Sequence, residues 1–239
     1  MSVFRFKQFD VNQTGCAMKV NTDGVLLAAL TDADKPENIL DIGAGTGVIS
    51  LILAQRFQSA NIKAVEIDEA AAAVAAANFA ASPFQARLQA FPSSFEEYLS
   101  KQQLDKLDLI ISNPPFFIDS LKSDDPLKRI ARHTDLLFFQ NLLRESAVNL
   151  SKMGELVMIL PGILSVVVQK IALQYGMFLR KSVSIKSFAS SKPHREILYF
   201  GLLPVNPEKA ADRCFVIYSG QKEYSGEYRA LLKDFLIIF

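Results

Sequence analysis

Alternation between short apolar runs and longer helical segments is the feature that most constrains the fold of this chain. Five runs have the length and composition of buried strands: Asn38–Ile42, Ile62–Glu66, Arg87–Phe91, Leu107–Ser112 and Glu155–Leu160. Five further segments have helical patterns: Gly47–Arg56, Glu69–Ala80, Phe95–Lys101, Thr134–Leu150 and Ser165–Tyr175. Because strands that are joined through helices run parallel, the pattern predicts an α/β fold with a doubly wound, mostly parallel sheet and helices on both faces.

The pattern changes after Gly176, where β-rich segments follow one another without intervening helices. These segments are Leu179–Phe188, Glu196–Leu203 and Cys214–Tyr218. An antiparallel hairpin that closes the sheet is the simplest interpretation, and Ser225–Phe239 has the apolar face of a short terminal helix. A chain of 239 residues without repeats or a linker forms one domain more comfortably than two.

Composition excludes several classes of protein. Half of the residues are hydrophobic, which argues against disorder, and two cysteines supply neither a disulfide framework nor a zinc cluster. The longest apolar stretch, Leu156–Val168, is too short to span a bilayer, and the first residues lack a signal-peptide core. His133 and His194 are too isolated to be metal ligands. We therefore expect a cytoplasmic protein without a metal or membrane partner.

A glycine loop, Asp41-Ile-Gly-Ala-Gly-Thr-Gly47, follows the first predicted strand. Its spacing fits neither a nicotinamide site nor a phosphate-binding P-loop. A carboxylate at Asp41 suits a ligand with positive charge, and S-adenosylmethionine carries both an ammonium and a sulfonium. Glu66 ends the next strand, where an acidic side chain typically binds ribose hydroxyls. The alternative is a tight strand-to-helix turn without a ligand.

The tetrapeptide Asn113-Pro114-Pro115-Phe116 follows the predicted strand Leu107–Ser112. The Asn113 side-chain oxygen and the Pro114 carbonyl can each accept a hydrogen bond from an amino group, and Phe116 can stack on a base. The alternative is an Asn-Pro turn that simply ends a strand. Together with the glycine loop, the motif indicates chemistry on a nitrogen.

The glycine loop, Glu66 and the Asn-Pro-Pro-Phe motif together resemble those of the class I S-adenosylmethionine-dependent methyltransferases that modify adenine N6. Three flanking segments, Gln13–Leu27, Arg129–His133 and Tyr228–Phe235, make the chain similar to the bacterial tRNA1(Val) adenine-37 N6-methyltransferase family. The resemblance covers nearly the whole chain. It implies a Rossmann-like seven-stranded sheet, S-adenosylmethionine as cofactor and an adenine of the tRNA anticodon loop as substrate, and we expect a monomer.

The resemblance also implies roles for individual residues at the cofactor. Asp41 and the three glycines, Gly43, Gly45 and Gly47, would hold the methionine part, and Glu66 the ribose. Thr22 would approach the cofactor carboxylate, with residues 1–30 forming an extension that closes the site over a 31–239 core. Ser94 stands where such enzymes often have an Asp for the cofactor adenine, so a hydroxyl or a backbone carbonyl would take that role here.

Basic residues follow the Asn-Pro-Pro-Phe motif and indicate an RNA partner. Residues 1–110 contain 9 Lys and Arg against 13 Asp and Glu, whereas residues 111–239 contain 17 against 12. Besides Asn113, Pro114 and Phe116 at the reacting nitrogen, we expect contacts to the substrate from Pro115, Lys128, Arg129, Arg132, His133, Lys192 and Arg195. For each charged segment, the alternative is solvated loop charge.

Other functions remain open on the residues alone. A protein glutamine N5-methyltransferase would use the same amide grip, although such enzymes typically have Tyr in the fourth position and an added N-terminal domain. A DNA adenine N6-methyltransferase lacks an evident target-recognition domain here. The hypothesis outside enzymes is a catalytically silent module that binds S-adenosylmethionine or RNA.

Overall fold

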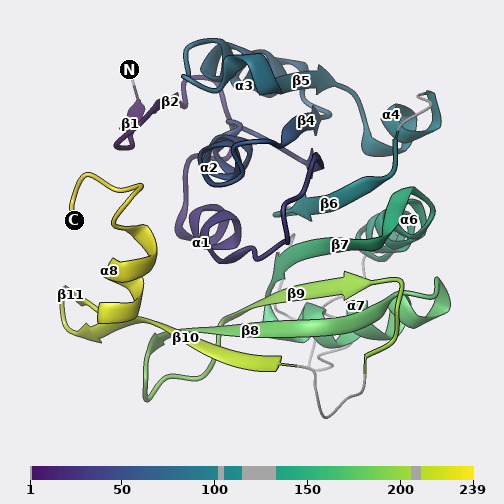
Figure 1. Cartoon of the computed structure of the whole chain (residues 1–239). Coiled ribbons are helices and arrows are strands. Elements are labelled where there is room, and N and C mark those ends of the chain that lie inside the picture. The colour runs from purple at the N-terminus through teal and green to yellow at the C-terminus, as the bar shows by residue number, and fades with distance from the viewer. Residues whose placement is uncertain (1, 102–104, 115–132, 206–210) are drawn as a thin grey trace.

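A nine-stranded sheet forms the centre of the computed structural model, which describes residues 2–101, 105–114, 133–205 and 211–239 (Figure 1). The strands in the order of the chain are β3 (Asn38–Ile42), β4 (Asn61–Glu66), β5 (Leu88–Pro92), β6 (Leu107–Ser112), β7 (Leu150–Leu160), β8 (Phe178–Phe188), β9 (Arg195–Gly201), β10 (Ala211–Gly220) and β11 (Glu223–Tyr224). Their order across the sheet is β11-β10-β8-β9-β7-β6-β3-β4-β5.

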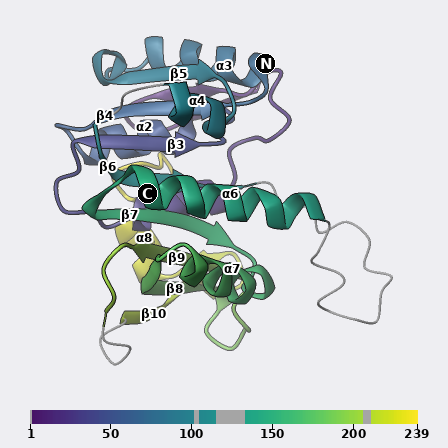
Figure 2. The same cartoon turned by 90° about the vertical axis from the view of Figure 1, so that its right-hand side faces the viewer.

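Helices cover both faces of this sheet. The sheet has a hydrophobic cluster on each face. One cluster includes residues of α1, α2, α3 and α8, and the other includes residues of α4, α6 and α7. Figure 2 shows α4, α6 and α7 in front of the sheet. The helices are α1 (Thr22–Leu30), α2 (Val48–Arg56), α3 (Glu69–Ala80), α4 (Phe95–Lys101), α6 (His133–Asn149), α7 (Gly162–Gln174) and α8 (Gly226–Leu232), with a short 3-10 turn at Gln85–Arg87.

Burial on both faces explains why the central strands are apolar at nearly every position. On β3, Ile39 belongs to the first cluster, whereas Leu40 and Ile42 belong to the second. A parallel strand with helices on both sides has no solvent face, so its sequence does not alternate. The alanine-rich α3 begins after an N-cap residue, Asp68, whose side chain accepts a hydrogen bond from the Ala71 backbone N–H at 2.8 Å.

The predicted fold class is confirmed. The seven strands from β5 across to β8 form the mostly parallel sheet, and β8 and β9 form the antiparallel hairpin near the C-terminus. The structure adds two strands, because β10 pairs in parallel with β8 and β11 turns back on β10. It also adds α1 and a hairpin of β1 (Val3–Arg5) and β2 (Asp10–Asn12), whose second strand contacts α3.

One edge of the sheet collects the ends of most strands. β3, β4, β6 and β7 are mutually parallel, and β8 shares their direction because both β7 and β8 are antiparallel to β9. β10 is parallel to β8, so it ends at the same edge. We call this the carboxyl edge. Ligands bind at such edges in open α/β sheets, which makes this edge the place to look for a functional site.

Candidate active site

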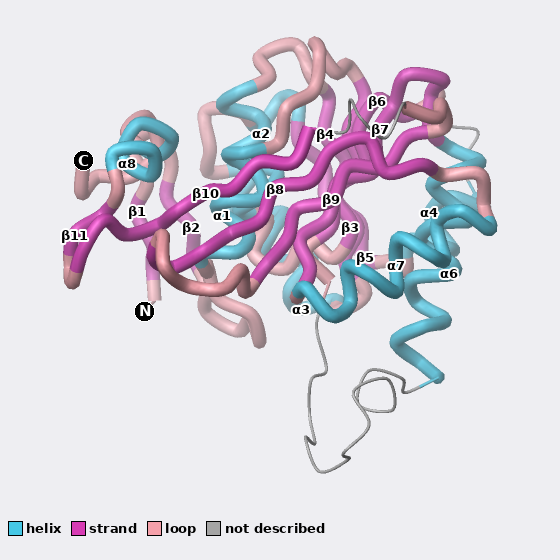
Figure 3. The backbone as a smooth tube through the Cα atoms, turned by 90° about the horizontal axis from the view of Figure 1, so that it is seen from below, coloured by secondary structure: helices cyan, strands magenta, loops and turns pink. Residues whose placement is uncertain are grey.

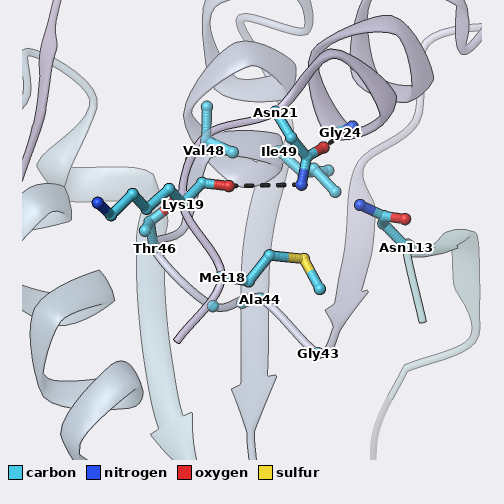
Figure 4. Close-up of a pocket in the computed structure, with 11 residues that line it drawn as sticks. Met18, Lys19, Asn21, Gly24, Gly43, Ala44, Thr46, Val48, Ile49 and Asn113 are labelled. Atoms are coloured by element: carbon cyan, nitrogen blue, oxygen red, sulfur yellow. Dashed lines mark hydrogen bonds between the residues drawn. The ribbon is translucent and has the colours of Figure 1, made fainter. Parts of the chain in front are cut away.

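A pocket opens at the carboxyl edge beside the ends of β3 and β6 (Figure 4). Its wall combines the glycine loop, the segment before α1, the first turns of α1 and α2, and the residue that follows β6. The lining residues are Met18, Lys19, Asn21, Gly24, Gly43, Ala44, Gly45, Thr46, Val48, Ile49 and Asn113. Three segments that are distant in the sequence therefore meet at one pocket.

The glycine loop gives this pocket a wall of bare backbone. Gly43, Gly45 and Gly47 have φ angles of 75°, 55° and 78°, in the left-handed region that favours glycine. A Cβ added at Gly43 or Gly45 would meet no atom within 4 Å. These two glycines line the pocket, so open space adjoins the backbone there, as the close approach of a ligand requires.

Glu66 supports the loop from the neighbouring strand. Its Oε2 accepts a hydrogen bond from the Gly45 N–H at 2.8 Å, and its Oε1 accepts from the Asp68 N–H at 3.0 Å. The loop and the end of β4 are thereby tied together. The next residue, Ile67, is an apolar side chain that is 75% exposed. The carboxylate and this exposed side chain follow one another at the end of β4.

Asp41 lies beneath the loop and is fully buried. Its Oδ2 accepts a hydrogen bond from the Ser50 hydroxyl at 2.6 Å, whereas its Oδ1 has no hydrogen-bond partner among the described residues. Burial, reinforced by the nearby charge of Glu66, raises the pKa of Asp41 to about 7 despite the hydrogen bonds from Ser50. A buried carboxylate with an unsatisfied oxygen favours a cation nearby.

Asn113 and Pro114 are both buried at the end of β6. The Asn113 side chain reaches the pocket wall made by α1, where its Nδ2 lies 3.7 Å from the position of a Cβ added to Gly24. In Figure 4 the amide nitrogen points towards the first turn of α1. A half-turn of the amide presents Oδ1 at the same place. The amide can therefore meet a pocket ligand with either a donor or an acceptor.

The first turn of α1 is held in place from two sides. Asn21 caps the helix through its Oδ1, which accepts from the Gly24 N–H at 2.9 Å, and its Nδ2 donates to the Lys19 carbonyl at 3.4 Å (Figure 4). Arg195, at the start of β9, forms an ion pair with Asp23 at an Nε–Oδ2 distance of 2.7 Å. This turn is therefore a fixed wall of the pocket.

Two comparisons with known sequences decide the family. The sequence model of the methyltransferase small domain matches residues 16–169. A tRNA1(Val) (adenine(37)-N6)-methyltransferase from Pedobacter heparinus is 43% identical over 238 residues, which cover 100% of this chain and 99% of the relative. The chain belongs to this methyltransferase family.

Solved structures share the fold of this methyltransferase at low sequence identity. A predicted O-methyltransferase from Agrobacterium tumefaciens matches with a TM-score of 0.64 at 15% identity, over 89% of this chain and 96% of that chain. A 16S rRNA N2 G1207 methyltransferase from Thermus thermophilus, in complex with AdoMet and guanosine, matches with a TM-score of 0.56 at 19% identity, over 83% of this chain and 49% of that chain. These likenesses concern the fold alone.

S-adenosylmethionine is the cofactor of the methyltransferase, as predicted. The residues present fit it. Gly43 and Gly45 leave open space beside the backbone, and the buried Asp41 oxygen that lacks a partner favours the positive charges that this cofactor carries. Asp41 does not itself line the pocket, so its effect on the cofactor acts from beneath the loop. Among the described residues, no group of three or more His, Cys, Asp or Glu side chains could hold a metal ion.

The structure brings most of the predicted cofactor residues to one place. Asp41 and the three glycines lie in or beneath the loop, Glu66 accepts a hydrogen bond from it at the end of β4, and Asn113 faces it across the pocket. Ser94 lies close to Glu66, since the Ser93 N–H donates to the Glu66 carbonyl at 3.0 Å, but its own hydroxyl caps α4 by accepting from the Glu97 N–H at 3.1 Å. Thr22 is exposed and does not line the pocket. Their roles at the cofactor stay predictions.

Only some of the predicted substrate residues lie in the described part of the chain. Lys192 is exposed in the β8–β9 turn, whereas Arg195 is half-buried and paired with Asp23. His133 opens α6, and its side chain is outside the described part of the chain. Outside the described residues altogether lie Pro115, Phe116, Lys128, Arg129 and Arg132. The substrate roles of all these residues stay predictions.

The pocket residues that precede α1 were not predicted from the sequence. Met18, Lys19 and Asn21 line the pocket, as does Gly24 in the first turn of the helix. A signal for this helix is present, because an Asn followed by an acidic residue and an apolar run is a typical helix start. The helix was not predicted because every residue of Val25–Leu30 is buried, so the apolar residues there do not follow the helical period.

The raised pKa of Asp41 predicts how the stability of the cofactor-free protein depends on pH. Unfolding returns this carboxyl to its ordinary pKa, near 3.8, so between pH 4 and 7 the unfolded state holds fewer protons than the folded state. This group therefore lowers the free energy of unfolding as the pH rises, by at most about 4 kcal/mol once both states are ionised.

Urea unfolding of wild type and Asp41→Asn from pH 4.5 to pH 8 measures this effect. We expect the free energy of unfolding of wild type to fall relative to that of Asp41→Asn as the pH rises, because Asn cannot ionise. Asp34→Asn, at an exposed position, controls for the loss of one charge. If the free energies of unfolding of wild type and Asp41→Asn change in parallel with pH, the pKa of Asp41 is not raised in the folded state.

Proposed function

We propose that this methyltransferase transfers the methyl group of S-adenosylmethionine to the exocyclic N6 of an adenine in tRNA, at position 37 beside the anticodon of a valine tRNA. The observation that carries the proposal is the shared pocket, in which Asn113 at the end of β6 faces the glycine loop at the end of the adjacent β3. The choice of tRNA and position rests on the activity for which the full-length relatives are named. We further propose that the enzyme is a cytoplasmic monomer that reads the anticodon loop.

Positioning by Asn113 and Pro114 is the main contribution of the chain to the reaction. The lone pair of an exocyclic amino group is delocalised into the ring, which makes the nitrogen a weak nucleophile. A side-chain oxygen at Asn113 and the backbone carbonyl of Pro114 each accept one N–H, which holds the nitrogen with its lone pair towards the methyl group. The cofactor supplies that methyl group in an electrophilic form. Orientation and electrostatics then lower the barrier without a strong base.

Exclusion of water is the second contribution of the chain. Asn113 is 9% exposed, and the apolar side chains of Val48, Ile49 and Met18 share the pocket with it. A desolvated amide oxygen attracts an N–H more strongly than one in water. A loop base enters such a pocket at lower cost than a base in a duplex, because no base pair has to be opened.

Mass mapping of the methylated nucleotide tests the proposed function. Purified protein, labelled S-adenosylmethionine and total unmodified tRNA should yield N6-methyladenine in valine tRNA at the position beside the anticodon. A DNA duplex and a glutamine-containing protein fraction, assayed in parallel, test for DNA adenine and protein glutamine methylation. Label in either one instead of tRNA would overturn the proposed substrate. Cofactor binding without transfer to any acceptor would favour the silent binding module.

A further inference from the structure

One face of the sheet is left open by the described helices at β10 and at the exposed end of β8, whereas α7 packs against β8 and β9 elsewhere on that face. Side chains alternate along these strands, and Val183, Ile185 and Phe215 point into the first hydrophobic cluster. Among the described elements, α8 is the helix that packs on β10, and its Tyr228 ring lies 6.3 Å from Phe215 on that core face. In Figure 2, β10 lies below α7. The opposite face carries Ser184, Lys186 and Phe188 on β8 and Cys214 and Val216 on β10, and at the end of β10 the Tyr218 side chain also packs against the first cluster.

Aromatic rings gather where this open face reaches the carboxyl edge. Phe188 and Tyr218 are paired in register, with ring centroids 5.6 Å apart. Tyr218 stacks on Tyr224 at 5.2 Å, and Tyr224 stacks on the buried Tyr228 at 4.7 Å (Figure 3 shows β10, β11 and α8 together). Phe188 ends the row and is 39% exposed. The row is thus anchored in the core at one end and exposed at the other.

Lysine side chains surround the exposed end of this row. Lys186 precedes Phe188 by two residues on the same face, and Lys192 and Lys222 are exposed in the turns that follow β8 and β10. None of the three forms an ion pair within the described part of the chain. Glu223, the first residue of β11, is an acidic neighbour of Lys222. A partner for this surface must therefore offer negative charge together with flat apolar groups.

The distance to the pocket suits a nucleic acid whose target base occupies it. Three strand-to-strand steps separate β6, which ends beside Asn113, from β8, which ends at Phe188. At about 4.8 Å per step, the two ends lie about 14 Å apart along the carboxyl edge. Stacked nucleotides rise by about 3.4 Å each, so about four nucleotides cover this span.

We propose that this open face, at β10 and the exposed end of β8, binds the tRNA chain next to the target base, with Phe188 stacking on a base and Lys186, Lys192 and Lys222 contacting phosphates. We call these four residues the edge patch. Stacking of bases on aromatic rings with nearby cations is the usual way to bind unpaired RNA. The inference rests on the proposed function, because it names a second surface for the same tRNA.

Affinity for unmodified tRNA, measured beside affinity for S-adenosylmethionine, tests the edge patch. Phe188→Ala should weaken tRNA binding about 10-fold, while Phe188→Tyr retains most of it because the ring is kept. Replacing the three lysines with Ala should reduce the slope of log affinity against log salt by about 0.7 for each phosphate that the protein no longer neutralises. Cofactor binding should stay unchanged in every variant, because none of these residues lines the pocket.

Matched controls come from the opposite edge of the sheet, where β7 begins. Met153 is 64% exposed and Lys152 is also exposed, so Met153→Ala and Lys152→Ala remove the same kinds of group from an accessible position away from the pocket. Both should keep wild-type affinity for tRNA. If Phe188→Ala proves unstable, the lysine variant still tests the patch, since surface lysines contribute little to folding.

Three outcomes would overturn the edge patch. In the first, the wild type methylates tRNA, and the Phe188 and lysine variants bind tRNA with the affinity and salt slope of wild type. This outcome leaves the proposed function intact. The second is a dimer in solution that Phe188→Ala dissociates without loss of tRNA binding, which makes the face an interface between two copies. The third is a wild type that binds cofactor but no tRNA, which removes the proposed substrate as well.

Discussion

Asn113→Ala is expected to lower methyl transfer by about 100- to 1,000-fold while leaving S-adenosylmethionine binding within a few-fold of wild type. The loss follows from the removal of an oriented dipole that acts on the reacting nitrogen, and groups of this kind typically contribute that much to a rate. Cofactor binding survives because the glycine loop, Glu66 and Asp41 keep their contacts without Asn113. Single-turnover transfer to tRNA and cofactor titration by calorimetry measure the two quantities separately.

Two further variants separate chemistry from packing at this position. Asn113→Asp keeps an acceptor oxygen at the same place, so we expect it to retain more activity than Asn113→Ala. Asn149→Ala, at the end of α6, removes an amide whose Nδ2 donates to the Glu145 carbonyl, and it should leave transfer unchanged. Full activity in Asn113→Ala would show that the amide has no part in the reaction.

The strands of the parallel core and the location of the site were predictable from this sequence because they depend on local signals. The apolar runs around Leu40 and Ile110 are buried on both faces, which a parallel sheet requires, and they showed no alternation. Asn113 and the glycine loop follow two of these runs. Since strands in a parallel sheet end at one edge, their meeting in one pocket followed from topology alone.

Features that depend on partners distant in the sequence were not predictable. The pairing of β10 with β8 brings Tyr218 into register with Phe188, and nothing near either residue in the sequence indicates that partner. The burial of Asp41 was also hidden, because the motif gives the residue type and not its depth beneath the loop. The sequence predicted Arg195 as a substrate contact near a turn, and it gave no sign that this residue pairs with Asp23, which is 172 residues away.

Gly47→Ala is expected to destabilise the protein by about 2–5 kcal/mol, which lowers the melting temperature by about 5–15 °C. Two costs add. Gly47 has a φ angle of 78°, where any Cβ strains the backbone. An added Cβ would also lie 2.5 Å from Cε1 of Phe79, a ring that is 2% exposed and packed in the core, and 3.3 Å from the Cβ of Ala75.

Gly43→Ala separates the two costs, because Gly43 has a similar φ angle of 75° but no atom lies within 4 Å of an added Cβ. Its destabilisation should therefore be limited to backbone strain of about 1–2 kcal/mol. Its effect on function should be the larger one, because a methyl group there enters the pocket and obstructs the cofactor. Calorimetric melting should thus show the larger loss of stability in Gly47→Ala, and cofactor titration should show the larger loss of affinity in Gly43→Ala. Adding Phe79→Leu should partly restore the melting temperature of Gly47→Ala but not that of Gly43→Ala. Equal melting temperatures for the two variants would rule out the clash with Phe79 as the reason for glycine at position 47.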